Sequence, residues 1–559
     1  MDMVRSLFSG RLVQGLLQIK ALSFCIGRQP FGQLKFKRLS WKAFARSREF
    51  NPANPSSKGK MTTENPIGNE IYQTTEEHPD VLDAEIEGKI PNWVEGTLLR
   101  VGPGKFEWGD TKYNHWFDGD AILNRFAIKD GSVKFSSRFL RSKSYKESEK
   151  NNRIVLAQFG TTPPPDPCKN IFSRFFSYFQ MPEMTDNCNV NIVKVKGGHY
   201  ASTEAPKLWK FDKDTLETLD PIDFGKRISG PRSWLAHPHY DEDGTYYNVS
   251  TSYMKNRNEI YKVPAKQDLE TATDESAEMI SSFPCSKGPA YYHSFGMTEN
   301  YFIFMESSLF FTNPLGLFFM RLMDWAYVDF FKFNENIKSR LHLIERKSGK
   351  PFAIFNVNPF MCFHQINAYE TDTEVVLDMS GYSDGSVMKA LYLSELREDA
   401  ETKIKPAELR RYHLSLAKAD SGKPKQVELE KDAEGKDYEV LHVGFELPRI
   451  NYDYNGRDYS YAYGMGSSSK PPGLLILHKV NVKTKEVKSW ECENCHPSEP
   501  VFVPSPNASK EDDGVVLSSV LGIRGQKSFL LVLDACDMTE IARAYVPVRL
   551  VPLVHGEFL

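Results

Sequence analysis

Cysteine is scarce in this chain, with 8 residues among 559. Small secreted proteins that lack a large core depend on dense disulfide frameworks, and this composition excludes that class. We therefore expect reduced thiols. Long hydrophobic runs are also missing: no uninterrupted stretch reaches the roughly 18 apolar residues that a membrane-spanning helix needs, so no such helix is expected.

The whole chain has little net charge, only −3, but this charge is unevenly distributed along the sequence. Residues 1–60 hold twelve lysine or arginine residues against two acidic ones, a balance of +10 that leaves −13 for the remainder. The acidic body argues against nucleic acid as a partner. The basic, acid-poor segment is typical of a mitochondrial presequence and predicts mitochondrial localisation. A basic arm on anionic lipid, with a cytoplasmic or membrane-associated protein, is the alternative.

A regular internal repeat is absent too, yet short strand-like runs recur between turn signals. They are rich in Val, Ile, Leu, Phe and Tyr, as in Tyr301–Met305, Glu374–Asp378 and Phe529–Leu533. This pattern is typical of an all-β protein. A large β-propeller accommodates such a length in one closed unit, but without a visible repeat the number of blades does not follow from periodicity.

Two segments are unusually apolar, Ile171–Phe179 and Leu309–Phe333. The first alternates aromatic and basic residues next to Cys168, as an interfacial helix or a lipidated loop does. A peripheral membrane contact is one interpretation of both segments. A helix that caps the core is the other.

Four histidines stand far apart in short apolar or turn-like surroundings: His237, His293, His364 and His555. One such residue alone is more often a hydrogen-bonded core histidine than a ligand, but the set points to a single metal site assembled by the whole fold. Imidazole suits iron, copper or zinc, so the residue type does not choose the metal.

A site made only of neutral imidazoles leaves the charge of the ion uncompensated. Metal-bound histidines usually give their other ring N–H to a carboxylate or carbonyl. Glu204, Glu446 and Glu499 are the candidates, because each stands beside apolar or turn residues. Loop caps or partners of surface lysines are the alternative roles for these three glutamates.

The sequence Cys492-Glu-Asn-Cys495-His496 fits the pattern of covalent haem attachment. The pattern is short and no axial partner is indicated, so haem is not expected.

Eight motifs, in this order along the chain, resemble those of the animal carotenoid oxygenase family. They are Pro91–Gly104, Asn114–Gly119, Pro165–Phe172, His237–His239, Tyr292–Gly296, Phe363–Asn367, Pro497–Pro500 and Glu511–Leu517. The resemblance covers about residue 65 to the C-terminus. It implies one propeller domain over residues 65–559, preceded by the basic leader over residues 1–60 that the charge distribution indicates.

The resemblance implies an all-β, seven-bladed β-propeller with a helical and loop cap over the metal-bearing face. By motif, His237, His293, His364 and His555 take the positions of the Fe(II) ligands, one ion per chain, and Glu204, Glu446 and Glu499 those of the carboxylates behind them. In the His-Pro-His motif the ligand is the first histidine, which leaves His239 a structural residue.

The implied activity is Fe(II)-dependent cleavage of a carotenoid or xanthophyll double bond by dioxygen. The leader favours eccentric 9′,10′ cleavage. Symmetric 15,15′ cleavage to retinal and retinyl-ester isomerohydrolase chemistry remain alternatives, the latter because of the Pro165–Phe179 stretch. Ala205 after Glu204, and Trp234 before the first histidine, depart from the family's pattern and bear on substrate preference. A propeller that binds carotenoid without catalysis is the alternative of a different class.

Overall fold

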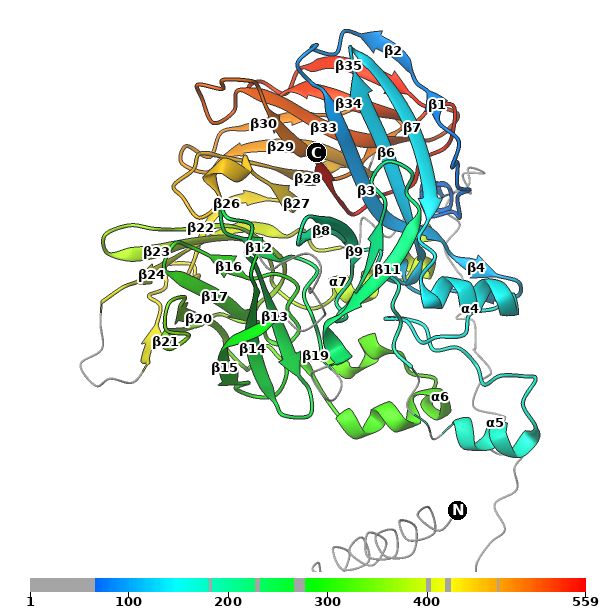
Figure 1. The fold of residues 1–559 in the computed structure, drawn as a ribbon. Helices are drawn as coiled ribbons and strands as arrows, with labels where there is room; N and C mark the ends of the chain where they lie inside the picture. The colour runs from blue at the N-terminus through cyan, green and yellow to red at the C-terminus, as the bar shows by residue number, and fades with distance from the viewer. Residues whose placement is uncertain are drawn as a thin grey trace, which may run out of the picture. The chain divides into compact units, whose positions relative to one another are not determined.

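The computed structural model describes residues 66–178, 180, 183–226, 232–265, 277–398, 404–417, 424–469 and 472–559, which belong to the compact unit Asn65–Leu559. The predicted leader, residues 1–60, lies outside these residues. Within them the strands form seven sheets of four to six strands and two two-stranded sheets. The seven large sheets are the blades of a β-propeller, as expected (Figure 1).

The first three blades come from the N-terminal half of the chain. Blade 1 has the order β1(Leu82–Asp83), β7(Ser132–Phe139), β6(Asp120–Lys129), β3(Gly96–Lys105) and β36(His555–Phe558). Blade 2 comprises β11(Thr218–Asp223), β10(Lys207–Phe211), β9(Gly198–Ser202) and β8(Asn191–Val195). Blade 3 comprises β12(His239–Tyr240), β13(Tyr246–Ser252), β14(Arg257–Val263) and β15(Glu278–Pro284).

The next two blades follow directly along the chain. Blade 4 has the order β16(Gly296–Met297), β17(Tyr301–Glu306), β20(Ser339–Glu345), β21(Pro351–Val357) and β25(Lys425–Glu428). Blade 5 comprises β22(Met361–Glu370), β23(Glu374–Tyr382), β24(Glu408–Ser415) and β26(Glu439–Val443).

The last two blades complete the ring. Blade 6 comprises β27(Glu446–Arg449), β28(Tyr461–Ser469), β29(Pro472–Asn481) and β30(Val487–Trp490). Blade 7 has the order β2(Glu85–Gly88), β35(Glu540–Tyr545), β34(Phe529–Asp534), β33(Gly514–Gly522) and β31(Cys495–Pro497), and β32(Val501–Pro504) also pairs with β33.

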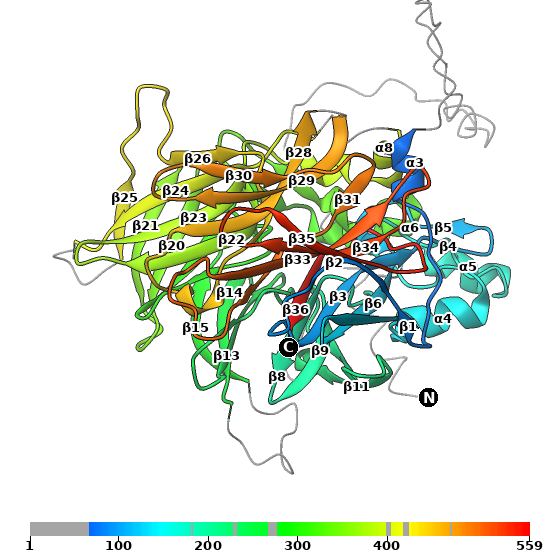
Figure 2. The same cartoon turned by 90° about the horizontal axis from the view of Figure 1, so that it is seen from above.

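Both ends of the described chain close the ring. The last strand, β36, pairs antiparallel with β3 in blade 1, where Val101 lies opposite His555. The early strand β2 pairs with β35 in blade 7. Figure 2 shows β36, drawn in red, beside the blue β3. Closure in this way protects the sheet edges that an open sheet of this size exposes.

Short helices and irregular segments connect the strands, and several of them form the cap. The helices are α3(Ile67–Ile71), α4(Lys143–Asn151), α5(Ile171–Ser177), α6(Met320–Met323), α7(Val387–Ala390) and α8(Leu393–Arg397). The 3₁₀ helices are η2(Trp116–Asp118), η3(Phe224–Lys226), η5(Pro314–Phe319), η6(Tyr327–Phe330) and η8(Tyr452–Tyr454). The two-stranded sheets pair β4(Glu107–Trp108) with β5(Thr111–Lys112) and β18(Leu309–Phe311) with β19(Phe331–Phe333).

The core is divided between the spaces separating blades and the cap. Alternate side chains of neighbouring blades pack together, as in the cluster that contains Leu343, Phe355 and Leu377. The cap has its own cluster, which includes Met361, Phe363 and Leu391 and so reaches the strand that carries His364. The cap thereby sets an apolar ceiling over the centre of the propeller.

One pair of cysteines does not follow the expectation that the thiols are reduced. Cys492 and Cys495 form a disulfide, whereas Cys168, Cys188, Cys285, Cys362 and Cys536 are free. The two paired residues are three apart and flank a turn, so the backbone itself brings their sulfur atoms together, which composition alone does not reveal. The expectation of reduced thiols was wrong for this pair.

Candidate metal centre

Each of the seven blades contributes one of the seven candidate side chains to the centre of the propeller. Blades 1, 3, 4 and 5 supply the histidines, at or just before their innermost strands β36, β12, β16 and β22. Blades 2, 6 and 7 supply the glutamates. Glu204 follows β9, Glu446 begins β27, and Glu499 lies between β31 and β32. Residues up to 351 positions apart in sequence therefore meet because the inner ends of all blades face one axis.

The four histidine rings converge through their Nε2 atoms. His237 Nε2 lies 2.9 Å from His293 Nε2, and His364 Nε2 lies 3.2 Å from His555 Nε2. One potential ligand nitrogen from each ring lies within 4.8 Å of the other three. The second histidine of the His-Pro-His motif, His239, points elsewhere, because its Nε2 contacts the carbonyl oxygen of Phe295 at 2.8 Å.

The three glutamates hold three of these rings from behind. Nδ1 of His293 lies 2.5 Å from Glu204 Oε1, Nδ1 of His364 lies 2.6 Å from Glu446 Oε2, and Nδ1 of His555 lies 2.7 Å from Glu499 Oε1. An ionised carboxylate only accepts hydrogen bonds, so each Nδ1 carries the proton. The Nε2 lone pairs are then left facing the shared centre.

Burial favours the neutral, metal-binding form of His237, His293 and His555. Burial, together with the neighbouring histidines, holds the pKa of His237 and of His555 well below its usual value. Burial also lowers the pKa of His293, although the Glu204 carboxylate opposes the change. Metal ligation requires neutral imidazole. The tautomers, the convergence of the Nε2 atoms and the charge state therefore all fit a single cation.

Two further residues position the glutamates, and sequence reasoning missed both. The hydroxyl group of Tyr291 donates to Glu204 Oε1 at 2.7 Å. Arg100 is fully buried and donates through Nη1 to Glu499 Oε2 at 2.9 Å. A signal for Arg100 existed in the sequence, since it is one charged residue inside the apolar strand run Leu98–Val101. A charge there requires a buried partner.

An apolar cavity of about 330 Å³ adjoins His293 and His364 beneath the cap. Its lining includes the aromatic side chains of Trp116, Phe117, Phe159, Phe311, Phe331, Phe363 and Tyr382. Ala205, a departure from the family pattern, lines this cavity, whereas Trp234 is fully buried beside Phe224.

A second cavity, of about 360 Å³, approaches the histidines with a different lining. His237, His364 and His555 border it together with Arg449 and Tyr452. His364 is common to both cavities. The histidine group thus lies between an aromatic space under the cap and a more polar space along the inner strands.

Replacing Glu446 by glutamine is expected to weaken metal binding by about 10–100-fold, because the variant loses the anion that fixes the His364 ring. Competition with a chelator measures the affinity. Glu374→Gln is the matched control, since Glu374 pairs with Nδ1 of His413, an exposed histidine outside the centre in blade 5, the blade that carries His364. Equal affinities for the two variants would contradict the role given to Glu446.

A closed propeller whose axis carries a buried four-histidine group defines a class of metal-binding propeller proteins. The RPE65 family model, described as retinal pigment epithelial membrane protein, matches residues 71–559. The chain therefore belongs to the RPE65/carotenoid oxygenase family, and the expectation that it is an enzyme is confirmed.

Similar proteins support the same placement. The chain is 40% identical over 511 residues to β,β-carotene 15,15′-dioxygenase of Gallus gallus, covering 87% of this chain and 96% of that protein. It is also 40% identical over 522 residues to the mitochondrial carotenoid-cleaving dioxygenase of Mustela putorius furo, covering 88% and 96%.

Among solved structures, a mutant of Synechocystis apocarotenoid oxygenase matches with a TM-score of 0.72 and 22% identity, covering 87% of this chain and 97% of that one. A cobalt-substituted form of the same oxygenase matches with a TM-score of 0.70 at 22% identity and the same coverage. At this identity the likeness establishes the fold alone.

Proposed function

We propose that this protein is an Fe(II)-dependent dioxygenase that cleaves a carotenoid double bond into two carbonyl products. The observation that carries the proposal is the convergence of four histidines, three of them held by carboxylates, at the edge of an aromatic cavity. The names of the two relatives, both carotenoid-cleaving dioxygenases, agree with it.

His237, His293, His364 and His555 would hold the iron, and iron supplies the activation of dioxygen when bound. Glu204, Glu446 and Glu499 orient the rings and offset the positive charge. The aromatic lining accommodates a rigid conjugated chain and excludes water from it. Phe363 stands at the junction, with its ring centroid 5.6 Å from that of His293 and 6.0 Å from that of Phe117.

The position of a carotenoid along this cavity decides which double bond lies beside the histidines. We propose eccentric 9′,10′ cleavage, which agrees with the basic leader and with the mitochondrial relative. Symmetric 15,15′ cleavage is the second candidate, because the Gallus gallus relative is equally similar to this chain.

Mass spectrometry of the products formed from β-carotene or zeaxanthin under labelled dioxygen tests the activity of the iron-loaded protein. Labelled apocarotenals are expected, and their lengths identify the bond that is cut. Retinal alone would support symmetric cleavage instead. Intact carotenoid despite bound iron would overturn the proposal in favour of a retinyl-ester isomerohydrolase or a carotenoid-binding propeller, which incubation with a retinyl ester separates.

The site of action is proposed to be the mitochondrion, on the basis of the leader over residues 1–60 and its charge. A reporter protein fused to residues 1–60 is expected to enter mitochondria and to lose the segment by cleavage. Replacing the six arginine and six lysine residues of this segment by glutamine should leave the reporter in the cytoplasm. Unchanged import would contradict the presequence assignment.

We also propose a peripheral contact with the membrane in which a carotenoid dissolves. Helix α5 exposes four apolar side chains, those of Ile171, Phe172, Phe175 and Phe176. Phe319, Leu322 and Met323, near and in α6, are exposed as well, and Arg321 donates to the Ser177 carbonyl oxygen of α5. Both helices lie on the same side of the propeller (Figure 1). Of the described helices, none is both long and apolar enough to cross a membrane.

The double variant Phe172→Glu/Phe176→Glu is expected to reduce sedimentation with phosphatidylcholine vesicles at least about tenfold, because each buried Phe contributes roughly 1.5–3 kcal/mol. Phe172 is 73% and Phe176 61% exposed, so folding should be unaffected. Met254→Glu is the control, since Met254 is 73% exposed in the turn between β13 and β14 of blade 3. Equal vesicle binding by all variants would contradict the contact.

A further inference from the structure

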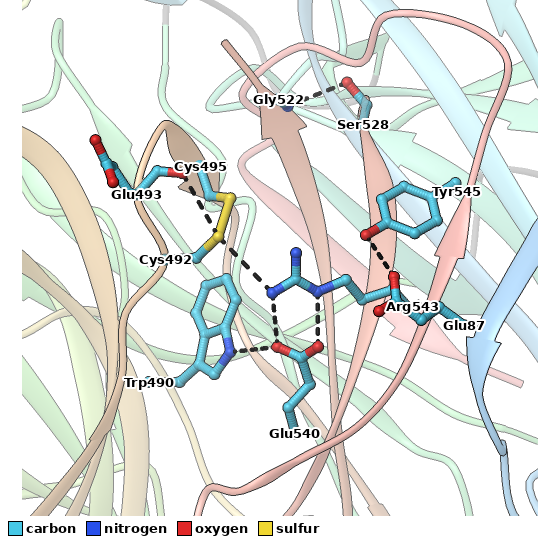
Figure 3. The surroundings of a disulfide bond; sticks show 10 residues. All are labelled: Glu87, Trp490, Cys492, Glu493, Cys495, Gly522, Ser528, Glu540, Arg543 and Tyr545. Atoms are coloured by element: carbon cyan, nitrogen blue, oxygen red, sulfur yellow. Dashed lines mark hydrogen bonds and ion pairs between the residues drawn. A yellow bond between two sulfur atoms is a disulfide. The ribbon is translucent and has the colours of Figure 1, made fainter. Parts of the chain in front are cut away.

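The disulfide between Cys492 and Cys495 occupies the connection between two blades (Figure 3). The outer strand of blade 6, β30, ends at Trp490, and the innermost strand of blade 7, β31, begins at Cys495 itself. Bridging residues that are three apart restricts the unfolded chain less than closing a long loop does, so it is a weak structural staple. The Cys-x-x-Cys spacing is instead that of reversible redox pairs.

The two sulfur atoms have unequal surroundings. Cys495 is buried and packs in the cluster that contains Val520 and Phe529, whereas Cys492 is only partly buried at the edge of this cluster. A reductant therefore reaches Cys492 first. Nη2 of Arg543 lies 3.8 Å from Cys492 Sγ, and Glu540 holds the guanidinium through Nε at 2.7 Å and Nη2 at 2.9 Å.

A guanidinium beside Cys492 favours the thiolate that reduction produces there. Glu540 in turn accepts a hydrogen bond from Trp490 Nε1 at 3.0 Å, which fixes the pair against the last residue of β30 (Figure 3). The position of this cation therefore depends on β30 and β35 and not on the turn that carries the cysteines.

The strand that starts at the disulfide leads to the candidate metal centre. Next along β31, His496 and Pro497 line the apolar cavity, and Ser498 Oγ accepts from the Leu553 amide at 3.2 Å. Glu499 then contacts His555. Only three residues thus separate the buried cysteine from the carboxylate that holds a candidate ligand.

We propose that Cys492 and Cys495 form a thiol–disulfide exchange site for dithiol reductants, and that its redox state controls the order of β31 beside the cavity. One thiolate of the reductant attacks Cys492 Sγ and breaks the S–S bond, and the Cys495 sulfur leaves as a thiolate and takes up a proton. The second thiol of the reductant then displaces Cys492. The protein gains two electrons and two protons, and the reductant becomes a disulfide.

The test equilibrates the folded, full-length protein with dithiothreitol in defined ratios of its reduced and oxidised forms. Alkylation and mass spectrometry of the peptide containing both cysteines then give the disulfide fraction. A reversible two-electron transition in the folded protein is expected. Persistence of the disulfide until the protein unfolds, or a pair that stays reduced at every ratio, would overturn the proposal.

Two variants of opposite effect sharpen the test. Arg543→Gln removes the cation that favours the Cys492 thiolate. The midpoint, which is the dithiothreitol ratio at which half of the disulfide is reduced, should therefore move several-fold toward a higher proportion of reduced dithiothreitol. Glu540→Gln removes the opposing anion, so half-reduction of the disulfide should occur at a lower proportion of reduced dithiothreitol. Cys536→Ser, at an exposed free cysteine, should leave the midpoint unchanged. Identical midpoints for the two charge variants would contradict the role of Arg543.

Hydrogen exchange of the folded protein tests whether the redox state of the two cysteines changes the order of β31. The amides of Cys495 and His496 should exchange faster in the dithiol form, while those of β27, the innermost strand of blade 6, should not change. Equal exchange of the Cys495 and His496 amides in both redox states would overturn the proposed control of β31. None of these readouts uses carotenoid cleavage, so their failure is distinguishable from failure of the proposed function.

Discussion

The variant His237→Ala is expected to lose bound iron and carotenoid cleavage together, whereas His239→Ala should retain both. The two histidines flank Pro238, but their rings meet different partners. His237 directs Nε2 at His293 Nε2, 2.9 Å away, and His239 directs Nε2 at the Phe295 carbonyl oxygen. Loss of a ligand should exceed the 10–100-fold effect typical of residues that only orient ligands.

Metal analysis of the purified proteins and product formation from β-carotene measure the two effects. The His239→Ala variant loses one buried hydrogen bond, which should cost about 1–3 kcal/mol of the free energy of unfolding without changing the metal content. Thermal unfolding checks this cost. Iron retained by His237→Ala and lost by His239→Ala would reverse the assignment of the ligand within the His-Pro-His motif.

The candidate residues were predictable from sequence, but their pairing was not. Motifs identified the four histidines and three glutamates individually. Glu204 and His293 are 89 residues apart, and His364 and Glu446 are 82 apart, so only the arrangement of blades decides which carboxylate faces which ring. The sequence positions of these residues alone therefore do not predict which glutamate pairs with which histidine.

The all-β class followed from the recurrence of short apolar runs, whereas the number of blades did not. Strands in the blades range from the two residues of β12 to the ten of β22, and blade 4 contains the cap segment from β18 to β19 between its strands β17 and β20. Such insertions remove any fixed period. The Cys492–Cys495 motif was visible in the sequence, but nothing in the composition marks it as a junction between blades.

Replacing Arg100 by methionine is expected to destabilise the protein by about 3–5 kcal/mol, the usual cost of leaving one charge of a buried pair without its partner. Arg100 on β3 of blade 1 pairs with Glu499 of blade 7, and both side chains are almost completely buried. Burial lowers the pKa of Arg100 to about 10, and the Glu499 charge opposes the change. Since Nη2 also approaches the carbonyl oxygens of Leu553 and Val554, the residue joins the last blade to the first.

Urea unfolding of the metal-free protein measures this effect, and a second substitution tests its cause. Arg100→Met/Glu499→Gln removes both charges, so it should be less destabilised than Arg100→Met alone, as expected when the cost comes from an unpaired buried anion. Lys129→Met removes one member of the exposed pair with Glu95 and should cost less than about 1 kcal/mol. Strictly additive losses in the double variant would mean that Arg100 acts through packing and its contacts with the main chain and not through the charge of Glu499.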